Sequence, residues 1–331
     1  SSPVVQALEK AVQNGKQVTV LMEVKARFDE ANNILMARRL EKAGAHVIYG
    51  LVGLKTHSKC TLVIRREKDG IRRYVHVATG NYNASTAKLY TDLGILTCND
   101  RFGIDASAFF NLLSGYSDPP IWDSFIVAPI NLRQRCIELI DREIHFAKNG
   151  EDAHMIAKMN SLLDKGIIEK LYEASQAGVK IELIVRGICV LIPGIPGASA
   201  NITVRSIVGR FLEHSRIFWF RNGGREELYI SSADWMPRNL NDRVELMVPI
   251  EDPEIKRRLK QMVDIELSDN QKAHIMQADG TWLKTISAEN QLCAQEYFQK
   301  IAEKRDAEDE MTLAQKLEPY TPVLGHGDGS D

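Results

Sequence analysis

The stretch His57-Ser58-Lys59-Cys60-Thr61-Leu62-Val63-Ile64 begins with a histidine near a cation and continues as an apolar, β-prone run. The turn sequence Lys68-Asp69-Gly70 follows it, and then a second apolar run, Tyr74-Val75-His76-Val77-Ala78. Two β-prone runs joined by a short turn that contains glycine are typical of a β-hairpin. The sequence therefore predicts a hairpin with a histidine at its entrance.

The same order of features returns in the second half of the chain. His214-Ser215-Arg216 opens the run Ile217-Phe218-Trp219-Phe220, and the turn Asn222-Gly223-Gly224 and the run Leu228-Tyr229-Ile230 follow. With 8 His and 42 Lys or Arg in 331 residues, about one His-x-Lys/Arg is expected by chance, so the tripeptide alone means little. The repeated hairpin around it indicates an internal duplication.

An alternation of strands and helices precedes each hairpin. Residues 18–23 and 47–49 have the pattern of strands, residues 30–43 have that of a helix, and a second round begins near Phe125. This alternation is typical of α/β layers. We therefore expect an α/β fold, with mixed sheets flanked by helices, in two domains related by internal duplication.

The expected domain limits follow from the two rounds of this pattern. The first domain is expected at residues 1–124 with His57, and the second at residues 125–305 with His214. Residues 306–331 are acidic and then rich in Gly and Pro, a composition that cannot bury a core. We expect them to be a disordered tail.

Composition limits the class of protein. The chain is 44% hydrophobic, which is enough for two cores, and no apolar run reaches the about 18 residues that span a membrane. The first residues lack the pattern of a signal peptide, so we expect a soluble, cytoplasmic protein. A net charge of −2 argues against a surface that binds polyanions throughout, and five scattered Cys suggest neither disulfides nor a zinc site.

The histidines suggest phosphoryl chemistry. In a strand His57 and Lys59 would point the same way, as would His214 and Arg216, and a neighbouring cation favours the neutral, nucleophilic imidazole. The same cation can stabilise phosphate oxygens. The ordinary alternative is a pair of half-buried strand histidines. A phosphate-binding P-loop, kinase signatures and a metal motif are not found in the sequence.

The paired His-x-Lys/Arg halves resemble the phospholipase D-like superfamily. That superfamily places an aspartate five residues after its lysine, where this chain has Ile64 and Arg221. Seven segments, in order along the chain, look like the carboxy-terminal half of the long-chain bacterial polyphosphate kinases. They are residues 22–30 (MEVKARFDE), 53–59 (GLKTHSK), 79–83 (TGNYN), 89–92 (LYTD), 183–187 (LIVRG), 211–216 (FLEHSR) and 231–235 (SSADW).

This resemblance implies roles for five residues. His57 matches the histidine that is phosphorylated by ATP, and His214 matches the second essential histidine, at the ATP phosphates. Tyr90 and Arg186 match residues that line the nucleotide site. Arg27 matches an arginine of the magnesium site, and because a guanidinium cannot ligate a cation we expect it to hold phosphate oxygens beside Mg²⁺. Taken alone, Arg27 could equally be a solvated charge and Tyr90 a packed strand residue.

The function implied by the resemblance is the reversible transfer of the terminal phosphate of ATP to inorganic polyphosphate, through phosphohistidine on His57 and with Mg²⁺. ATP, ADP and polyphosphate are then the partners, with no nucleic acid, and the family allows homo-oligomers and a peripheral association with the inner face of the membrane. The family also has two domains ahead of this segment, so we expect a fragment that can lack full activity. The alternatives are a phospholipase D-like phosphodiesterase or nuclease, and a non-catalytic polyanion-binding module.

Overall fold

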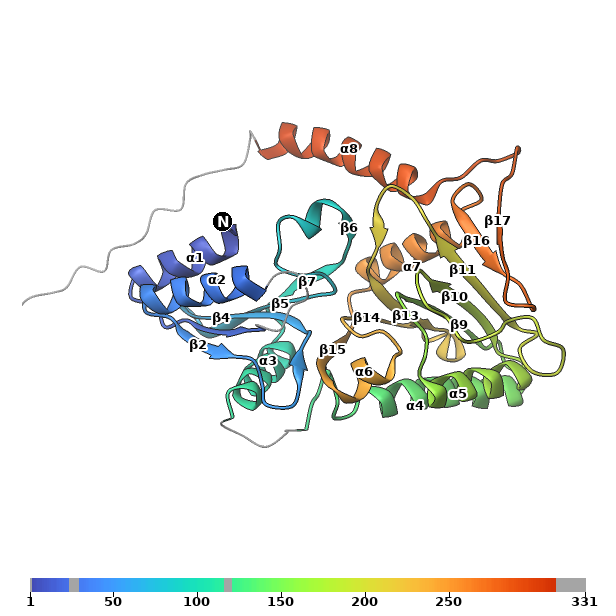
Figure 1. Ribbon diagram of the computed structural model, residues 1–331, viewed down its shortest axis with the longest axis horizontal. Helices are drawn as coiled ribbons and strands as arrows, with labels where there is room; N and C mark the ends of the chain where they lie inside the picture. Colours follow the sequence, from blue (N-terminus) through green and yellow to red (C-terminus); the bar gives the residue numbers. More distant parts are fainter. Residues whose placement is uncertain (1, 24–29, 116–120, 314–331) are drawn as a thin grey trace, which may run out of the picture.

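The computed structural model describes residues 2–23, 30–115 and 121–313, and it shows two halves side by side (Figure 1). The first half begins with a parallel pair of strands, β1 and β2, and two helices, α1 and α2. Their bounds are α1 Pro3–Gln13, β1 Thr19–Met22, α2 Glu30–Ala43 and β2 His46–Tyr49. The helices bury Val5 and Leu40 in a small cluster with the apolar residues of β1 and β2.

The first hairpin forms a separate antiparallel sheet in the order β4-β5-β7. Two short strands, β3 and β6, flank it in sequence but pair with the other half. The bounds are β3 Lys55–Thr56, β4 Lys59–Glu67, β5 Gly70–Ala78, β6 Tyr90–Thr91, β7 Gly94–Thr97 and, for the next helix, α3 Asp100–Leu113. The side chain of Asn99 caps α3 by accepting a hydrogen bond from the N–H of Arg101.

The second half is built on one ten-stranded mixed sheet, in the order β17-β16-β11-β10-β9-β13-β14-β15-β3, with β8 also paired to β15. The strands of this half are β8 Ile126–Ala128, β9 His154–Met159, β10 Lys180–Val185, β11 Ile202–Ile207, β12 Leu212–Glu213, β13 Arg216–Phe220, β14 Glu227–Ser231, β15 Arg243–Pro249, β16 Ala273–Met276 and β17 Trp282–Lys284. Of these, β12 lies outside the ten-stranded sheet and pairs with β6. The helices are α4 Leu132–Lys148, α5 Lys165–Gln176, α6 Pro237–Asn241, α7 Pro253–Leu267 and α8 Ala294–Leu313.

Helices cover both faces of this sheet. One core cluster joins α4 and α5 to one face (Figure 1). The second cluster lies on the opposite face, where α7 packs with residues of α3 and β5 from the first half. Since this cluster contains Val75 and Phe109 together with Trp219 and Val244, apolar packing joins the two halves.

The expected α/β fold, with mixed sheets flanked by helices, is confirmed. The two hairpins recur as β4-β5 and β13-β14, each followed by a third antiparallel neighbour. α8 continues through Leu313, into the stretch expected to be a disordered tail, and residues 314–331 lie outside the described residues, so the tail stays a prediction. The domain limits stay a prediction. None of the described helices is long and apolar enough to cross a membrane.

Candidate active site

His57 lies between β3 and β4 and is held by a strand of the second half. β3 pairs in parallel with β15, with Lys55 beside Arg243 and Thr56 beside Val244. The backbone N–H groups of His57 and Ser58 both donate to the carbonyl oxygen of Val244, at 2.9 Å. The first histidine therefore takes its position from the other half of the chain.

His214 is held in the reciprocal way. It lies between β12 and β13, and β12 pairs in parallel with β6, so that Leu212 lies beside Tyr90 and Glu213 beside Thr91. The N–H groups of His214 and Ser215 donate to the carbonyl oxygen of Thr91, at 3.2 and 2.9 Å. Each half thus supports the histidine of the other, as expected for a duplicated site with approximate twofold symmetry.

Each histidine contacts a carboxylate from the opposite half. His57 Nδ1 is 2.9 Å from Glu245 Oε2, and His214 Nδ1 is 2.7 Å from Asp92 Oδ1. Glu245 follows the strand residue that pairs with Thr56, and Asp92 follows the one that pairs with Glu213. A carboxylate that accepts a hydrogen bond from Nδ1–H favours the neutral tautomer whose lone pair is on Nε2.

Hydroxyl and amide groups orient both carboxylates. Glu245 is fully buried, and the Ser232 hydroxyl and the Asn239 amide both donate to it. Asp92 accepts a hydrogen bond from the Thr79 hydroxyl at 2.7 Å. Burial alone would raise the pKa of Glu245, but His57 and Lys59 outweigh burial and hold this pKa below its ordinary value. Glu245 is therefore ionised at neutral pH.

Both imidazoles are neutral at physiological pH. Burial, together with the charges of Lys59 and Arg216, lowers the pKa of His57 to about 4, against the opposing effect of Glu245. Burial also lowers the pKa of His214, with Arg216 acting in the same direction and Asp92 against it. A neutral imidazole has a free lone pair, which a nucleophile or a hydrogen-bond acceptor requires.

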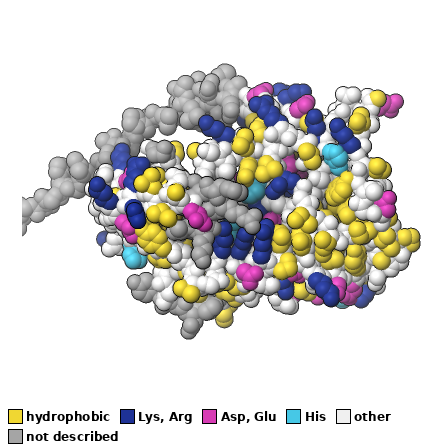
Figure 2. Space-filling model, viewed as in Figure 1, with side chains coloured by type: hydrophobic (Ala, Val, Ile, Leu, Met, Phe, Trp, Pro, Cys, Tyr) yellow, Lys and Arg dark blue, Asp and Glu magenta, His cyan; other side chains and the backbone are white. Residues whose placement is uncertain are grey.

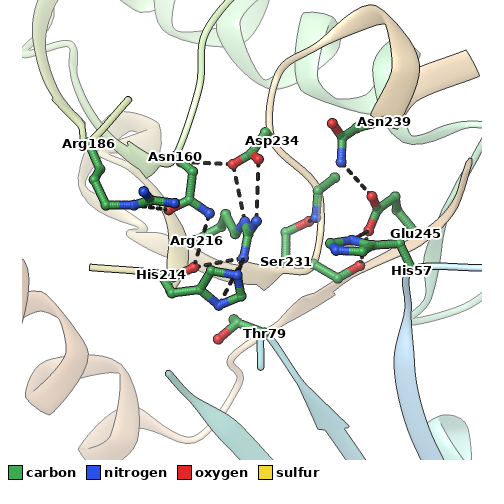
Figure 3. A network of polar contacts seen from close by, with 12 residues as sticks. His57, Thr79, Asn160, Arg186, His214, Arg216, Ser231, Asp234, Asn239 and Glu245 are labelled. Carbon is green, nitrogen blue, oxygen red and sulfur yellow. Dashed lines mark hydrogen bonds and ion pairs between the residues drawn. The ribbon is translucent and has the colours of Figure 1, made fainter. Parts of the chain in front are cut away.

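The two cations fold back onto the histidine backbone. Lys59 Nζ donates to the carbonyl oxygen of His57, and Arg216 Nη1 donates to that of His214 at 2.7 Å. Figure 3 shows how Arg216 is held: Asp234 Oδ1 accepts from its Nε at 3.1 Å. Arg216 Nη1 is also 3.2 Å from His214 Nε2, where it can only donate.

This contact makes the two histidines unequal. The guanidinium of Arg216 lies against the His214 ring, with Nη1 3.2 Å from Nε2 and 3.4 Å from Nδ1, whereas no hydrogen bond to His57 Nε2 is found among the described residues. Burial, helped by Arg216, also lowers the pKa of Lys59 to about 7, although Glu245 opposes this shift. Lys and Arg side chains gather near the middle of the face in Figure 2. Within the described part of the chain, His57 is thus the histidine whose Nε2 has no hydrogen-bond partner, and its surroundings are basic.

The structure brings Tyr90 and Arg186 to the His214 side of the site. The Tyr90 ring lies with its centroid 5.0 Å from that of His214. Arg186 Nε donates to Asn160 Oδ1 at 3.0 Å, and the backbone N–H of Asn160 donates to Asp234 at 2.7 Å (Figure 3). Burial lowers the pKa of Arg186, partly offset by the nearby Asp234 and Tyr90. These residues could contact one bound molecule.

The magnesium prediction cannot be examined in the same way. Arg27 lies outside the described residues. Within the described parts of the chain, no group of three or more His, Cys, Asp or Glu side chains could hold a metal ion. Both Arg27 and Mg²⁺ therefore stay predictions of the resemblance.

Gly80 is a position where the site has no room for a side chain. A Cβ built on residue 80 would lie 2.3 Å from Asp92 Oδ2. We expect Gly80→Ala to push Asp92 away from His214 and to lower the free energy of unfolding by about 1–3 kcal/mol. Chemical denaturation measures this change.

Gly166→Ala is the matched control for this prediction. Gly166 lies in the first turn of α5, where the nearest atom to an added Cβ is at 3.5 Å, an ordinary contact. Because alanine favours helix, this variant should keep or gain stability, by up to about 1 kcal/mol. Equal stability of the two variants would contradict the close packing of Gly80 against Asp92.

Comparisons with known proteins show which family this chain is similar to. Residues 1–119 match the family described as Polyphosphate kinase C-terminal domain 1, and residues 125–295 match Polyphosphate kinase C-terminal domain 2. The structure is similar to the crystal structure of polyphosphate kinase from Porphyromonas gingivalis, with a TM-score of 0.86 and 38% identity, over 93% of this chain and 47% of that one.

Two curated relatives extend the comparison. A polyphosphate kinase from Halalkalibacterium halodurans is 60% identical over 272 residues, which cover 82% of this chain and 39% of the relative. One from Synechocystis sp. is 55% identical over 306 residues, which cover 91% of this chain and 42% of the relative. The chain thus spans about two fifths of the length of these relatives. By its matched domains and its structure, the chain belongs to the polyphosphate kinase family.

Proposed function

We propose that this chain carries the phosphoryl-transfer centre of an ATP:polyphosphate phosphotransferase. His57 Nε2 attacks the terminal phosphorus of ATP, the N–P bond forms as the bond to the bridging oxygen breaks, and ADP leaves. A terminal oxygen of polyphosphate then attacks the same phosphorus, which restores His57 and lengthens the polymer by one phosphate. The reverse sequence transfers phosphate to ADP.

The carrying observation is that His57 Nε2 has no hydrogen-bond partner among the described residues, whereas the Arg216 guanidinium lies against the His214 ring. His57 is neutral, Glu245 holds its Nδ1 proton, and its Nε2 has no hydrogen-bond partner among the described residues. An attack from Nε2 creates a positively charged phosphoimidazole ring, which the ionised Glu245 stabilises at 2.9 Å. His57 therefore has the features of an activated nucleophile.

We assign His214 and its neighbours to the substrate phosphates and the nucleotide. His214 and Arg216 form a hydrogen-bonded pair that can meet the negative charge developing on the transferring group. Tyr90 can stack on a planar base, and Arg186 suits phosphate oxygens because its guanidinium is a planar fork. Mg²⁺, when bound, supplies charge neutralisation at the phosphates, and we assign Arg27 to phosphate oxygens next to it.

The test compares two labelled forms of ATP. With γ-labelled ATP and Mg²⁺, the chain should acquire an acid-labile, base-stable label on His57, since phosphohistidine has these stabilities. With α-labelled ATP it should acquire none. Label from α-labelled ATP would instead indicate nucleotidyl transfer, in which a diester bond is attacked, and absence of label from both forms would reject the phosphoenzyme.

The pH dependence of this labelling is a further prediction. Because the pKa of His57 is lowered to about 4, its ring should stay neutral from pH 7 to about pH 5, and labelling should fall only as the pH approaches 4. The unfolded chain protonates His57 near its ordinary value of 6.5, so this group removes stability as the pH falls from 6.5 towards 4.

The measurement is a titration of His57 by ¹⁵N NMR. The Glu245→Gln variant provides the control, because loss of the negative charge that opposes burial should lower the pKa of His57 further. A midpoint near 6.5, or a rise in the variant, would contradict the burial of a neutral nucleophile.

A further inference from the structure

A buried ion cluster lies directly behind His214. It consists of Lys158 on β9, Glu213 on β12 and Glu266 on α7, which are 2, 5 and 3% exposed. Lys158 Nζ is 2.7 Å from Glu213 Oε2 and also donates to Glu266 Oε1. Buried ion pairs are weak contributors to stability because desolvation opposes the attraction. A role in specifying geometry accounts for such a cluster better than a role in stability.

The carboxylate of Glu213 connects three parts of the molecule. Besides Lys158, it accepts hydrogen bonds from the Thr91 hydroxyl at 2.9 Å and from the Gln295 amide at 2.7 Å. Thr91 belongs to the first half, and Gln295 belongs to α8. Since Thr91 precedes Asp92 and Glu213 precedes His214, the Thr91–Glu213 hydrogen bond ties together the two segments that carry the His214–Asp92 pair.

The charges of the cluster keep Glu213 as the acceptor. Burial raises the pKa of Glu266 to about 7, with Glu213 acting in the same direction. Of the two carboxyl groups, Glu266 is therefore the one that takes up a proton first. Burial acts against ionisation of Glu213 too, but Lys158 and the hydrogen bonds from Gln295 and Thr91 hold its pKa below the ordinary value. Glu213 is therefore the ionised member that can accept from Thr91.

Among the described residues, no side-chain hydrogen bond equivalent to Thr91–Glu213 lies behind His57. Thr56 occupies the position of Glu213 before the histidine, and its hydroxyl is buried without a hydrogen-bond partner among the described residues. The position of Thr91 corresponds to Val244, which has no polar side-chain atom. The approximate symmetry of the site is thus broken behind the two histidines, and His57 can serve as an internal reference.

We propose that Glu213, held by Lys158 and Glu266, is a positioning residue that locks residues 90–92 against residues 212–214 and so fixes the tautomer of His214. The proposal rests on the proposed function only in treating His214 as part of the active site. The Thr91 hydroxyl adds a side-chain hydrogen bond to the backbone pairing of β6 with β12. Without it Asp92 can move from His214 Nδ1, and the ring then becomes free to adopt the Nε2–H tautomer that isolated histidine prefers.

The experiment compares Thr91→Val with Thr91→Ser by ¹⁵N NMR of the histidine rings at pH 7. The wild type and Thr91→Ser keep the hydroxyl and should show His214 as the Nδ1–H tautomer. Thr91→Val should shift the tautomer ratio towards Nε2–H on the order of fivefold, which corresponds to the loss of one hydrogen bond. Glu213→Gln, which retains the shape but lacks the charge, should shift it in the same direction.

The His57 tautomer provides the control, and thermal unfolding shows whether each variant is folded. The His57 tautomer should not change in any variant, because Glu245 and not Asp92 holds it. An unchanged His214 tautomer in folded Thr91→Val and Glu213→Gln would overturn the proposal, and equal changes at His57 would show general loosening instead. The readout is independent of ATP, so failure of the phosphoenzyme test and failure of this one are distinguishable.

Discussion

Replacing His57 by Asn should abolish phosphoenzyme formation from γ-labelled ATP, a fall of about 10⁴-fold or more. Asparagine is close to histidine in size, and its amide can still donate to Glu245, so the buried carboxylate keeps a partner. The amide nitrogen has no free lone pair with which to attack phosphorus. The variant therefore removes the nucleophile with little disturbance of the surrounding hydrogen bonds.

Two further variants complete this prediction. His214→Asn should still be labelled on His57 but about 10²–10⁴ times more slowly, because it removes a group that assists transfer and leaves the nucleophile. His145→Asn changes an exposed histidine on α4 and should be labelled like the wild type. Labelling of His57→Asn at the wild-type rate would reject His57 as the nucleophile. A label that disappears only in His214→Asn would make His214 the nucleophile and His57 the assisting residue.

Replacing Asp234 by Ala should lower the free energy of unfolding by about 3–5 kcal/mol, the largest stability effect that we expect in the site. Asp234 pairs with Arg216 through Oδ1 at 3.1 Å and Oδ2 at 3.3 Å, and it accepts from the backbone of Asn160. The Arg216 side chain is only 3% exposed. The substitution therefore leaves a buried cation without its counter-ion.

The exposed ion pair between Asp152 and Arg221 gives the matched control. The two side chains are 3.1 Å apart, and Asp152 is 75% exposed, so Asp152→Ala should change stability by no more than about 1 kcal/mol. Both variants are compared by urea denaturation at one pH. Similar decreases in the free energy of unfolding for the two variants would show that burial does not determine how much the Arg216–Asp234 pair contributes to stability.

Much of the fold could be predicted because its signals are local. The helix at residues 30–43 begins and ends where apolar periodicity and flanking residues place it. A compositional signal marks where a chain becomes polar and not where a helix ends, and α8 continues through Leu313, past the residue at which the tail was predicted to begin. The expected family was also confirmed, since several short motifs agree in order along the chain.

The partners of the two histidines could not be predicted in this way. Glu245 contacts His57 across 188 residues of sequence, and Asp92 contacts His214 across 122. The contacts depend on β3 and β6, strands of only two residues that have no detectable periodicity. The sequence signal for these partners is an acidic residue near the third strand of each repeat, Asp92 before β7 and Glu245 in β15. This signal identifies the partners only once the pairing of β3 with β15 and of β6 with β12 is known.

The sequence by itself determined that the chain has two similar halves, each with a histidine and a cation at the entrance of a hairpin, because hairpins and duplications depend on residues close together in sequence. Only the tertiary structure decided that each half supports the histidine of the other, and that the Arg216 guanidinium lies against the His214 ring while no described residue forms a hydrogen bond to Nε2 of His57. The physical reason is that hydrogen bonds and burial of these imidazoles depend on atoms from distant segments, which the packing of the two halves brings together.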